Sequence, residues 1–269
     1  MAAGRQVAGA GRRPRGEEAS YPRLTGRRAF VTGGATGIGA AIVEAFARQG
    51  TTVAFVDIAE GAARELADRL AAEGLPAPWL RRCDVTDVAD LQGAIAEATQ
   101  ALGDFHVLVN NVASDDRHSL QEVTPEYWDQ RVAINQRPAF FAIQAVVAGM
   151  QRLGGGSIIN LGSTGWQSKA GGYPVYATAK SSVNGLTRGL ARELGEQRIR
   201  INIVSPGWVM TERQIALWLD EAGEAELARS QCLPDKVWPE DIAAMVLFLA
   251  SDQARAITAQ EFLVDAGWR

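Results

Sequence analysis

The chain has few cysteines and histidines, and it lacks long apolar runs. Two cysteines, Cys83 and Cys232, stand among 269 residues, which excludes a framework of several disulfides and makes reduced thiols in the cytoplasm the expectation. The two histidines, His106 and His118, lie twelve positions apart. Because this spacing is not that of paired metal ligands, no metal site is expected. Every apolar run falls short of the ~20 residues that cross a bilayer.

Charge of neither sign dominates the sequence. The net charge is −4, and basic and acidic residues are interspersed along the chain. Proteins that bind nucleic acid usually concentrate positive charge on one surface, so a nucleic-acid partner is not expected. A membrane partner is not expected either. The apolar fraction of 47% is ordinary for a globular protein with a buried core.

The first 23 residues differ in composition from the rest. They are rich in glycine, alanine and arginine without apolar periodicity, and the apolar segment of a signal peptide is missing. We therefore expect residues 1–23 to form a disordered tail and residues 24–269 to form one domain.

Apolar strands alternate with amphipathic helices through residues 24–269. We expect strands at 28–32, 53–57, 80–84, 106–110, 157–161, 200–204 and 261–265. We expect helices at 40–49, 62–73, 87–102, 124–153, 174–194 and 240–250, with a polar helical insertion at 212–233. This alternation is typical of an α/β fold with a doubly wound (Rossmann), seven-stranded parallel sheet covered by helices on both faces.

Glycines crowd the loop after the first strand. The segment Gly33-Gly-Ala-Thr-Gly-Ile-Gly39 lies directly between a predicted strand and a predicted helix. Glycines allow the backbone to approach a pyrophosphate, and the helix N-terminus supplies hydrogen-bond donors. The loop therefore predicts a dinucleotide site, with contacts from Gly33, Thr36, Gly37, Ile38 and Gly39.

Asp57 ends the second predicted strand. A carboxylate at this position accepts hydrogen bonds from a ribose 2′-hydroxyl and repels a 2′-phosphate, which favours NAD as cofactor while NADP stays possible. The alternative is that Asp57 only caps the next helix.

Tyr176 and Lys180 lie four positions apart on a predicted helix, so their side chains share one face. A nearby ammonium favours the phenolate and lowers a phenol pKa that is ordinarily about 10. Ser163 follows an apolar strand and lies thirteen residues before Tyr176, where its hydroxyl can hold the reacting oxygen of a substrate. Taken alone, the Tyr-x-x-x-Lys pattern would equally suit a surface pair.

Together these motifs resemble the short-chain dehydrogenase/reductase family, over about residues 24–269. The run Thr32-Gly-x-x-x-Gly-Ile-Gly39 matches the family signature fully. The resemblance implies that Tyr176 is the general base, that Ser163 orients the substrate oxygen, and that Lys180 lowers the phenol pKa and binds the nicotinamide ribose. It also implies a fourth catalytic residue, Asn135, which holds a water that links Lys180 to solvent.

The resemblance implies further cofactor contacts. The adenosine half would lie against the second, third and fourth strand ends, and the nicotinamide carboxamide against the loop after the sixth strand. Here the fourth strand ends Asn-Asn-Val-Ala, where the family usually has Asn-Asn-Ala-Gly, and Thr36 stands where relatives that prefer NADP often carry Arg or Lys. The residues concerned are Asp57, Ile58, Asp84, Val85, Asn111, Ala113, Pro206, Gly207, Val209 and Thr211.

Three segments resemble a smaller group, the aldose 1-dehydrogenases that oxidise L-arabinose, D-galactose, D-xylose or L-fucose. The segments are Asn111-Val-Ala-Ser-Asp-Asp-Arg-His118, Pro206-Gly-Trp-Val-Met-Thr-Glu-Arg-Gln214 and Val264-Asp-Ala-Gly-Trp-Arg269. The implied reaction is NAD-dependent oxidation of the anomeric hydroxyl to an aldonolactone. Candidate substrate-binding residues are Ser114, Asp115, Ser163, Trp166, Tyr176 and Trp208.

Two other functions stay open. A 3-oxoacyl carrier-protein reductase, or another NAD(P)-dependent alcohol or ketone oxidoreductase, would share the motifs, but a carrier-protein reductase would prefer NADP and present a basic patch. A catalytically silent nucleotide sensor would not need the complete set of catalytic side chains.

Small residues recur every four positions on the Tyr176 helix, at Ala177, Ser181, Gly185 and Gly189. Such a row permits close approach of another helix or of the sheet. The family resemblance implies assembly through this helix, the helix before it and the last strand, so we expect a homotetramer, with Trp268 and Arg269 near a neighbouring subunit's site.

Overall fold

Seven parallel strands form a single sheet in the computed structural model, which describes residues 19–169 and 171–268. Their order across the sheet is β3-β2-β1-β4-β5-β6-β7, with each neighbouring pair parallel. The strands are β1 (Arg28–Thr32), β2 (Thr52–Asp57), β3 (Trp79–Arg82), β4 (Val107–Asn110), β5 (Gly156–Leu161), β6 (Ile199–Pro206) and β7 (Glu261–Val264). The predicted doubly wound sheet is confirmed.

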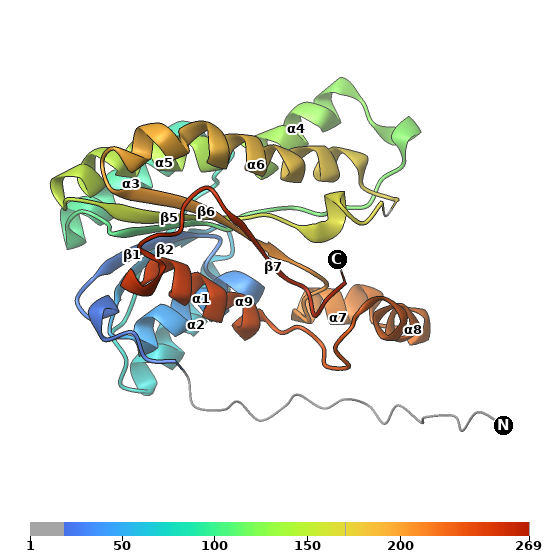
Figure 1. Ribbon diagram of the computed structural model, residues 1–269, viewed down its shortest axis with the longest axis horizontal. Coiled ribbons are helices and arrows are strands. Elements are labelled where there is room, and N and C mark those ends of the chain that lie inside the picture. The colour runs from blue at the N-terminus through green and yellow to red at the C-terminus, as the bar shows by residue number, and fades with distance from the viewer. Residues whose placement is uncertain (1–18, 170, 269) are drawn as a thin grey trace.

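Helices cover both faces of the sheet (Figure 1). One face carries α1 (Gly37–Arg48), α2 (Glu60–Ala72) and α9 (Pro239–Ala250). The other carries α3 (Val88–Leu102), α4 (Pro125–Asn135), α5 (Arg137–Arg152) and α6 (Pro174–Gly195). Short 3-10 turns lie at Pro22–Leu24, Leu120–Glu122, Thr164–Trp166 and Asp252–Ala254. Because strands buried on both faces contribute alternate side chains to each, two apolar clusters form, one on either side of the sheet.

One predicted helix is in fact two. The segment 124–153 divides into α4 and α5 at Gln136, whose backbone angles are φ −129° and ψ −54°. Pro138, in the first turn of α5, has no N–H to donate to a carbonyl four residues earlier, so the ladder of α4 cannot continue through it. The polar insertion likewise divides, into α7 (Glu212–Trp218) and α8 (Glu221–Ser230).

Residues just before position 24 already pack on the domain. Residues 1–18, most of the predicted tail, lie outside the described residues. The backbone N–H of Tyr21 donates to Gln49 Oε1 at 2.8 Å, and Leu24 is fully buried. The expected boundary therefore falls within a segment that already packs on the end of α1.

The carboxyl ends of the strands point toward α7 and α8 (Figure 1). The strand order reverses direction between β1 and β4, and in open α/β sheets the crevice outside such a point is where ligands bind. Across residues 19–169 and 171–268, every helix is too short or too polar to span a membrane.

Candidate active site

A cavity of about 840 Å³ opens at the carboxyl ends of the strands. The loops after β1 to β6 all contribute to its wall, together with α6, α7, α8 and Trp268 near the C-terminus. Sixteen of the seventeen predicted cofactor residues line it, all except Gly37: Gly33, Thr36, Ile38, Gly39, Asp57, Ile58, Asp84, Val85, Asn111, Ala113, Tyr176, Lys180, Pro206, Gly207, Val209 and Thr211.

The glycine loop is packed too tightly for side chains. A Cβ atom at Gly39 would lie 1.8 Å from the carbonyl oxygen of Gly33, and Gly37 has a positive φ of 54°. Thr36 begins α1 without a capping hydrogen bond from its side chain. The first backbone N–H groups of α1 therefore remain available at the cavity, as a pyrophosphate requires.

The Asp57 carboxylate is held by two backbone N–H groups, one in the glycine loop after β1 and one just before α2. Its Oδ2 accepts from the N–H of Ala35, and its Oδ1 accepts from the N–H of Ala59, each at 3.0 Å. Ala59 is the N-cap residue of α2, so Asp57 does help to begin that helix. The same carboxylate lines the cavity, and the capping alternative and the cofactor interpretation are therefore compatible.

The β4 loop is tied to the glycine loop. The Asn111 side-chain amide donates to the carbonyl of Gly33 at 2.8 Å and to that of Thr32 at 3.2 Å. On the loop after the edge strand β3, the Asp84 carboxylate accepts from the N–H and hydroxyl of Thr86, and these bonds hold its pKa below the ordinary value. Both sets of hydrogen bonds fix the shape of the cavity wall at these two loops.

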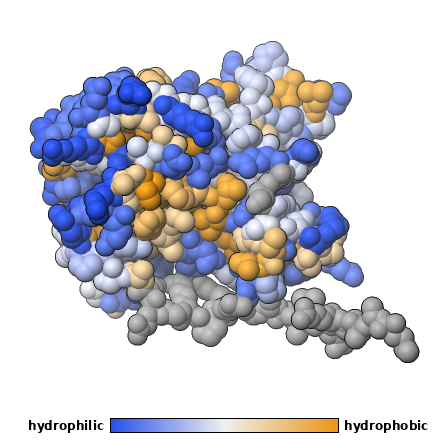
Figure 2. All heavy atoms as spheres, in the orientation of Figure 1, coloured by the Kyte–Doolittle hydropathy of each residue, from blue (hydrophilic) through white to orange (hydrophobic). Residues whose placement is uncertain are grey.

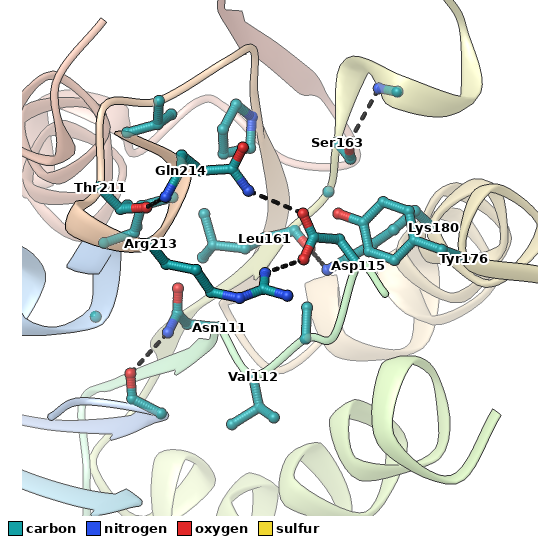
Figure 3. A pocket seen from close by; sticks show the side chains of 18 of the residues that line it. Asn111, Val112, Asp115, Leu161, Ser163, Tyr176, Lys180, Thr211, Arg213 and Gln214 are labelled. Atoms are coloured by element: carbon teal, nitrogen blue, oxygen red, sulfur yellow. Dashed lines mark hydrogen bonds and ion pairs between the residues drawn. The ribbon is translucent and has the colours of Figure 1, made fainter. Parts of the chain in front are cut away.

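Burial is the largest influence on the pKa of the Tyr176 phenol. It raises the pKa of Tyr176 to about 12, and the interaction with the Ser163 hydroxyl acts in the opposite direction. Burial also lowers the pKa of Lys180 to about 8. The Lys180 ammonium lies 6.0 Å from the centre of the Tyr176 ring and donates to the carbonyl of Leu161 at 2.8 Å (Figure 3). The net direction of this pKa is therefore opposite to the lowering expected from Lys180.

Asn135 lies behind the cavity wall. Its Oδ1 accepts from the N–H of Ser114 at 2.8 Å, and its Nδ2 donates to the Ser114 carbonyl at 3.1 Å. Both polar ends of the amide thus hold the loop after β4. Among the predicted substrate residues, Asp115, Ser163, Tyr176 and Trp208 line the cavity, whereas Ser114 and Trp166 do not.

Asp115 faces the cavity beside Tyr176, and its carboxylate is bound by two side chains of α7 (Figure 3). Its carboxylate forms an ion pair with Arg213 and accepts from the Gln214 amide at 2.9 Å. Its negative charge contributes to the raised pKa of Tyr176. Arg213 and Gln214 were not predicted as site residues, although both lie in the segment 206–214 that resembles the aldose dehydrogenases.

Arg117 was likewise not predicted to line the cavity. Its guanidinium lies 4.2 Å from the centre of the Tyr173 ring and 5.2 Å from that of Trp218. The Tyr173 ring in turn meets Tyr176 edge to face, with centroids 5.6 Å apart. A guanidinium stacked between rings keeps its edge free to donate hydrogen bonds, which suits an oxygen-rich ligand.

The C-terminal segment closes the far wall. Trp268 lines this cavity in its own chain, and its ring centre lies 6.3 Å from that of Trp208. Arg269 lies outside the described residues. Within the described part of the chain, no three His, Cys, Asp or Glu side chains gather as metal ligands.

Comparison with known proteins agrees with this geometry. Residues 33–269 match the family described as Enoyl-(Acyl carrier protein) reductase. The D-xylose 1-dehydrogenase of Caulobacter vibrioides is 46% identical over 251 residues, covering 93% of this chain and 99% of that protein. The probable galactose dehydrogenase GalD of Rhizobium meliloti is also 46% identical, over 92% of this chain and 96% of its own length.

A solved structure gives the same fold. The blue fluorescent protein from a metagenomic library, solved in complex with NADPH, is 38% identical and superposes with a TM-score of 0.84. The match covers 91% of this chain and 98% of that one.

Proposed function

The chain belongs to the short-chain dehydrogenase/reductase family, and we propose that it oxidises the anomeric hydroxyl of an aldose to the aldonolactone, with NAD as the hydride acceptor. The observation that carries this proposal is the 46% identity, over nearly the whole chain, to both a D-xylose and a galactose dehydrogenase. The aldose is of the L-arabinose, D-galactose, D-xylose or L-fucose class.

The protein is an oxidoreductase that acts on CH–OH groups with a nicotinamide cofactor. The cavity fits such a cofactor, because the side-chain-free glycine loop and the open start of α1 meet the needs of a pyrophosphate. Asp57 at the end of β2 would accept hydrogen bonds from the adenosine ribose, which supports NAD over NADP. When bound, the cofactor accepts a hydride at nicotinamide C4.

We assign the proton transfer to Tyr176. As a phenolate it removes the proton from the anomeric hydroxyl while the hydride leaves the same carbon, so the products are lactone, reduced cofactor and a proton. Ser163 holds the substrate oxygen against the phenol. Because burial raises the phenol pKa, the phenolate must be favoured by positive charge that arrives with the cofactor and by Lys180. Base catalysis of this kind contributes about 10²–10⁴-fold to the rate.

The other end of the cavity supplies groups for a sugar. The edge of the Arg117 guanidinium donates, the Asp115 carboxylate accepts, and the faces of Trp208 and Trp218 offer flat apolar surface. Sugars present hydroxyls and apolar C–H faces together, so this combination supports an aldose as substrate.

A panel assay tests the proposal. The purified protein is given NAD or NADP with D-xylose, D-galactose, L-arabinose and L-fucose, and reduced cofactor is followed by absorbance. We expect turnover with NAD and at least one of these aldoses. Turnover only of acetoacetyl thioesters with NADPH would favour the carrier-protein reductase, and cofactor binding without turnover would favour the nucleotide sensor.

The proposal includes a homotetramer. A Cβ atom at Gly185 or at Gly189 would meet open space, so this row of α6 faces away from the sheet. On the face in Figure 2, apolar side chains gather over the edge strand β7, where Leu263 is 38% exposed. Exposed small and apolar surfaces of this kind support association of subunits.

A further inference from the structure

His118 is a buried imidazole on the loop between β4 and α4. The residue is only 8% exposed. Its Nε2 accepts a hydrogen bond from the backbone N–H of Val175 at 3.2 Å, and its own backbone N–H donates to the Gly172 carbonyl at 2.8 Å. The loop after β4 is thereby joined to the start of α6, one residue before Tyr176.

The hydrogen-bond partners of the ring determine which of its two nitrogens carries the proton. A backbone N–H can only donate, so Nε2 must carry a lone pair and the ring proton must sit on Nδ1. Nδ1 lies 2.8 Å from the Tyr127 hydroxyl and 2.9 Å from the Asp116 carbonyl, both of which can accept that proton. The ring is thus held in one tautomer, with its proton on Nδ1, between α4 and α6.

Helix α6 has no side-chain cap of its own. Tyr173 occupies the N-cap position without such a bond, and Pro174, the first helical residue, has no N–H. Val175 therefore carries the first N–H of the helix, and the His118 ring satisfies it from another element. A satisfied first turn resists fraying, and Tyr176 is its next residue.

We propose that His118 is a positioning residue for the reaction: it caps the catalytic helix and holds the Tyr176 hydroxyl in place. This inference rests on the proposed function, because it takes Tyr176 to be the general base. His118 touches neither substrate nor cofactor in this scheme and acts only through α6.

Charged and titratable groups surround the ring on every side. Its own loop contributes the Asp116 and Arg117 side chains and, further along, the Glu122 carboxylate, which accepts from the backbone N–H of Ser119. From α4 come the Tyr127 phenol and the Arg131 guanidinium, which lies 5.1 Å from the centre of the Tyr127 ring. From α6 comes the positive end of the helix dipole.

Two substitutions at one position separate positioning from packing. His118→Leu removes the acceptor, whereas His118→Gln places an amide oxygen about as far along the side chain as Nε2. We expect His118→Leu to lower kcat by about 10-fold or more, because small displacements of a catalytic group are costly. Separately measured NAD affinity should change less than about 3-fold, and His118→Gln should restore kcat to within about 3-fold of native.

A matched control lies at the opposite end of the sheet. His106 Nδ1 also accepts from a backbone N–H, that of Arg28 at 3.2 Å, but far from the cavity. His106→Leu should leave kcat per folded molecule unchanged, even where it lowers the melting temperature. If His118→Leu does not fold, Tyr127→Phe tests the positioning role of His118 by removing one hydrogen-bond partner of its Nδ1. We then expect a smaller loss of kcat with unchanged NAD affinity.

Native kcat in His118→Leu would overturn the proposal, as would equal losses in the Leu and Gln variants. If His118→Leu does not fold, native kcat in Tyr127→Phe would overturn it. A native protein that oxidises no aldose but reduces a ketone would contradict the sugar assignment alone, and the same variants would then be compared with that ketone.

Discussion

Asp115, on the loop after β4, forms an ion pair with Arg213 at the start of α7, and the pair lies beside Tyr176 (Figure 3). A second bond from Gln214 occupies the other carboxylate oxygen. The pair joins two segments on opposite sides of the cavity. It also places a negative charge near the phenol that we assign as the base, which opposes loss of the phenol proton.

Replacing Asp115 by Asn should therefore shift the pH profile. Burial is the main cause of the raised Tyr176 pKa, and Asp115 adds to it, so removing the charge should lower that pKa. We expect the acid limb of kcat to move to lower pH, and the KM of the sugar to rise by about 3- to 10-fold as the bonds to α7 weaken. The exposed residue Asp129 on α4 provides the control, Asp129→Asn. A limb that moves to higher pH would contradict the electrostatic account.

Lys180→Met should stabilise the protein while reducing activity. Burial lowers the Lys180 pKa from 10.5 to about 8, so below pH 8 the folded state carries a charge that is better solvated in the unfolded chain. We expect the variant to be more stable by up to about 3 kcal/mol at pH 7. Between pH 8 and 10.5 the unfolded state binds more protons, so native stability gains and the difference should shrink. Urea unfolding at pH 7 and pH 10 measures both values, and a less stable variant at pH 7 would refute the prediction.

Asp57→Ala should change the choice of cofactor. Without the carboxylate, a ribose hydroxyl loses its acceptor and a 2′-phosphate is no longer repelled. We expect kcat/KM for NAD to fall by about 10-fold or more, while that for NADP holds or rises. Steady-state kinetics with both cofactors gives the ratio, and Asp68→Asn, on the exposed side of α2, is the control. An unchanged ratio would show that Asp57 serves only to begin α2.

Gly185→Leu should disrupt the proposed tetramer. A side chain at this position meets open space within the chain, so a change in assembly cannot be ascribed to a clash inside the subunit. Gly61 on α2 is likewise open, and Gly61→Leu is the matched control. Sedimentation velocity at micromolar concentration should show smaller species only for the Gly185 variant. A tetramer that survives this substitution would place the interface elsewhere.

The fold followed from patterns that are local in sequence. Apolar strands, the glycine loop and the Pro125 start of α4 each report on a few neighbouring residues, and these elements lie within a few residues of their predicted bounds. The break at Gln136 was missed even though Pro138, which removes a helical hydrogen bond, signalled it. Tyr176 and Lys180 were expected together because a four-residue spacing places them on one helix face, and Ser163 because it follows a strand end; all three line the cavity.

The site residues that were missed depend on contacts distant in sequence. Arg213 reaches Asp115 from the far side of the cavity, and the stacking of Arg117 on Tyr173 joins two separate loops. Residue type alone does not indicate these contacts, since a charged side chain can pair equally well with its neighbours in sequence. The net direction of the phenol pKa was misjudged for a similar reason, because four-residue spacing gives proximity but not the burial that decides both pKa values.

The most direct test of the account is the turnover of Tyr176→Phe with NAD and the best aldose of the panel. The substitution removes one oxygen and keeps the ring that packs against Tyr173. We predict that kcat falls by about 10²–10⁴-fold while the affinity for NAD and the melting temperature stay close to native. Turnover at the native rate in a folded, NAD-binding variant would contradict the assignment of Tyr176 as the base.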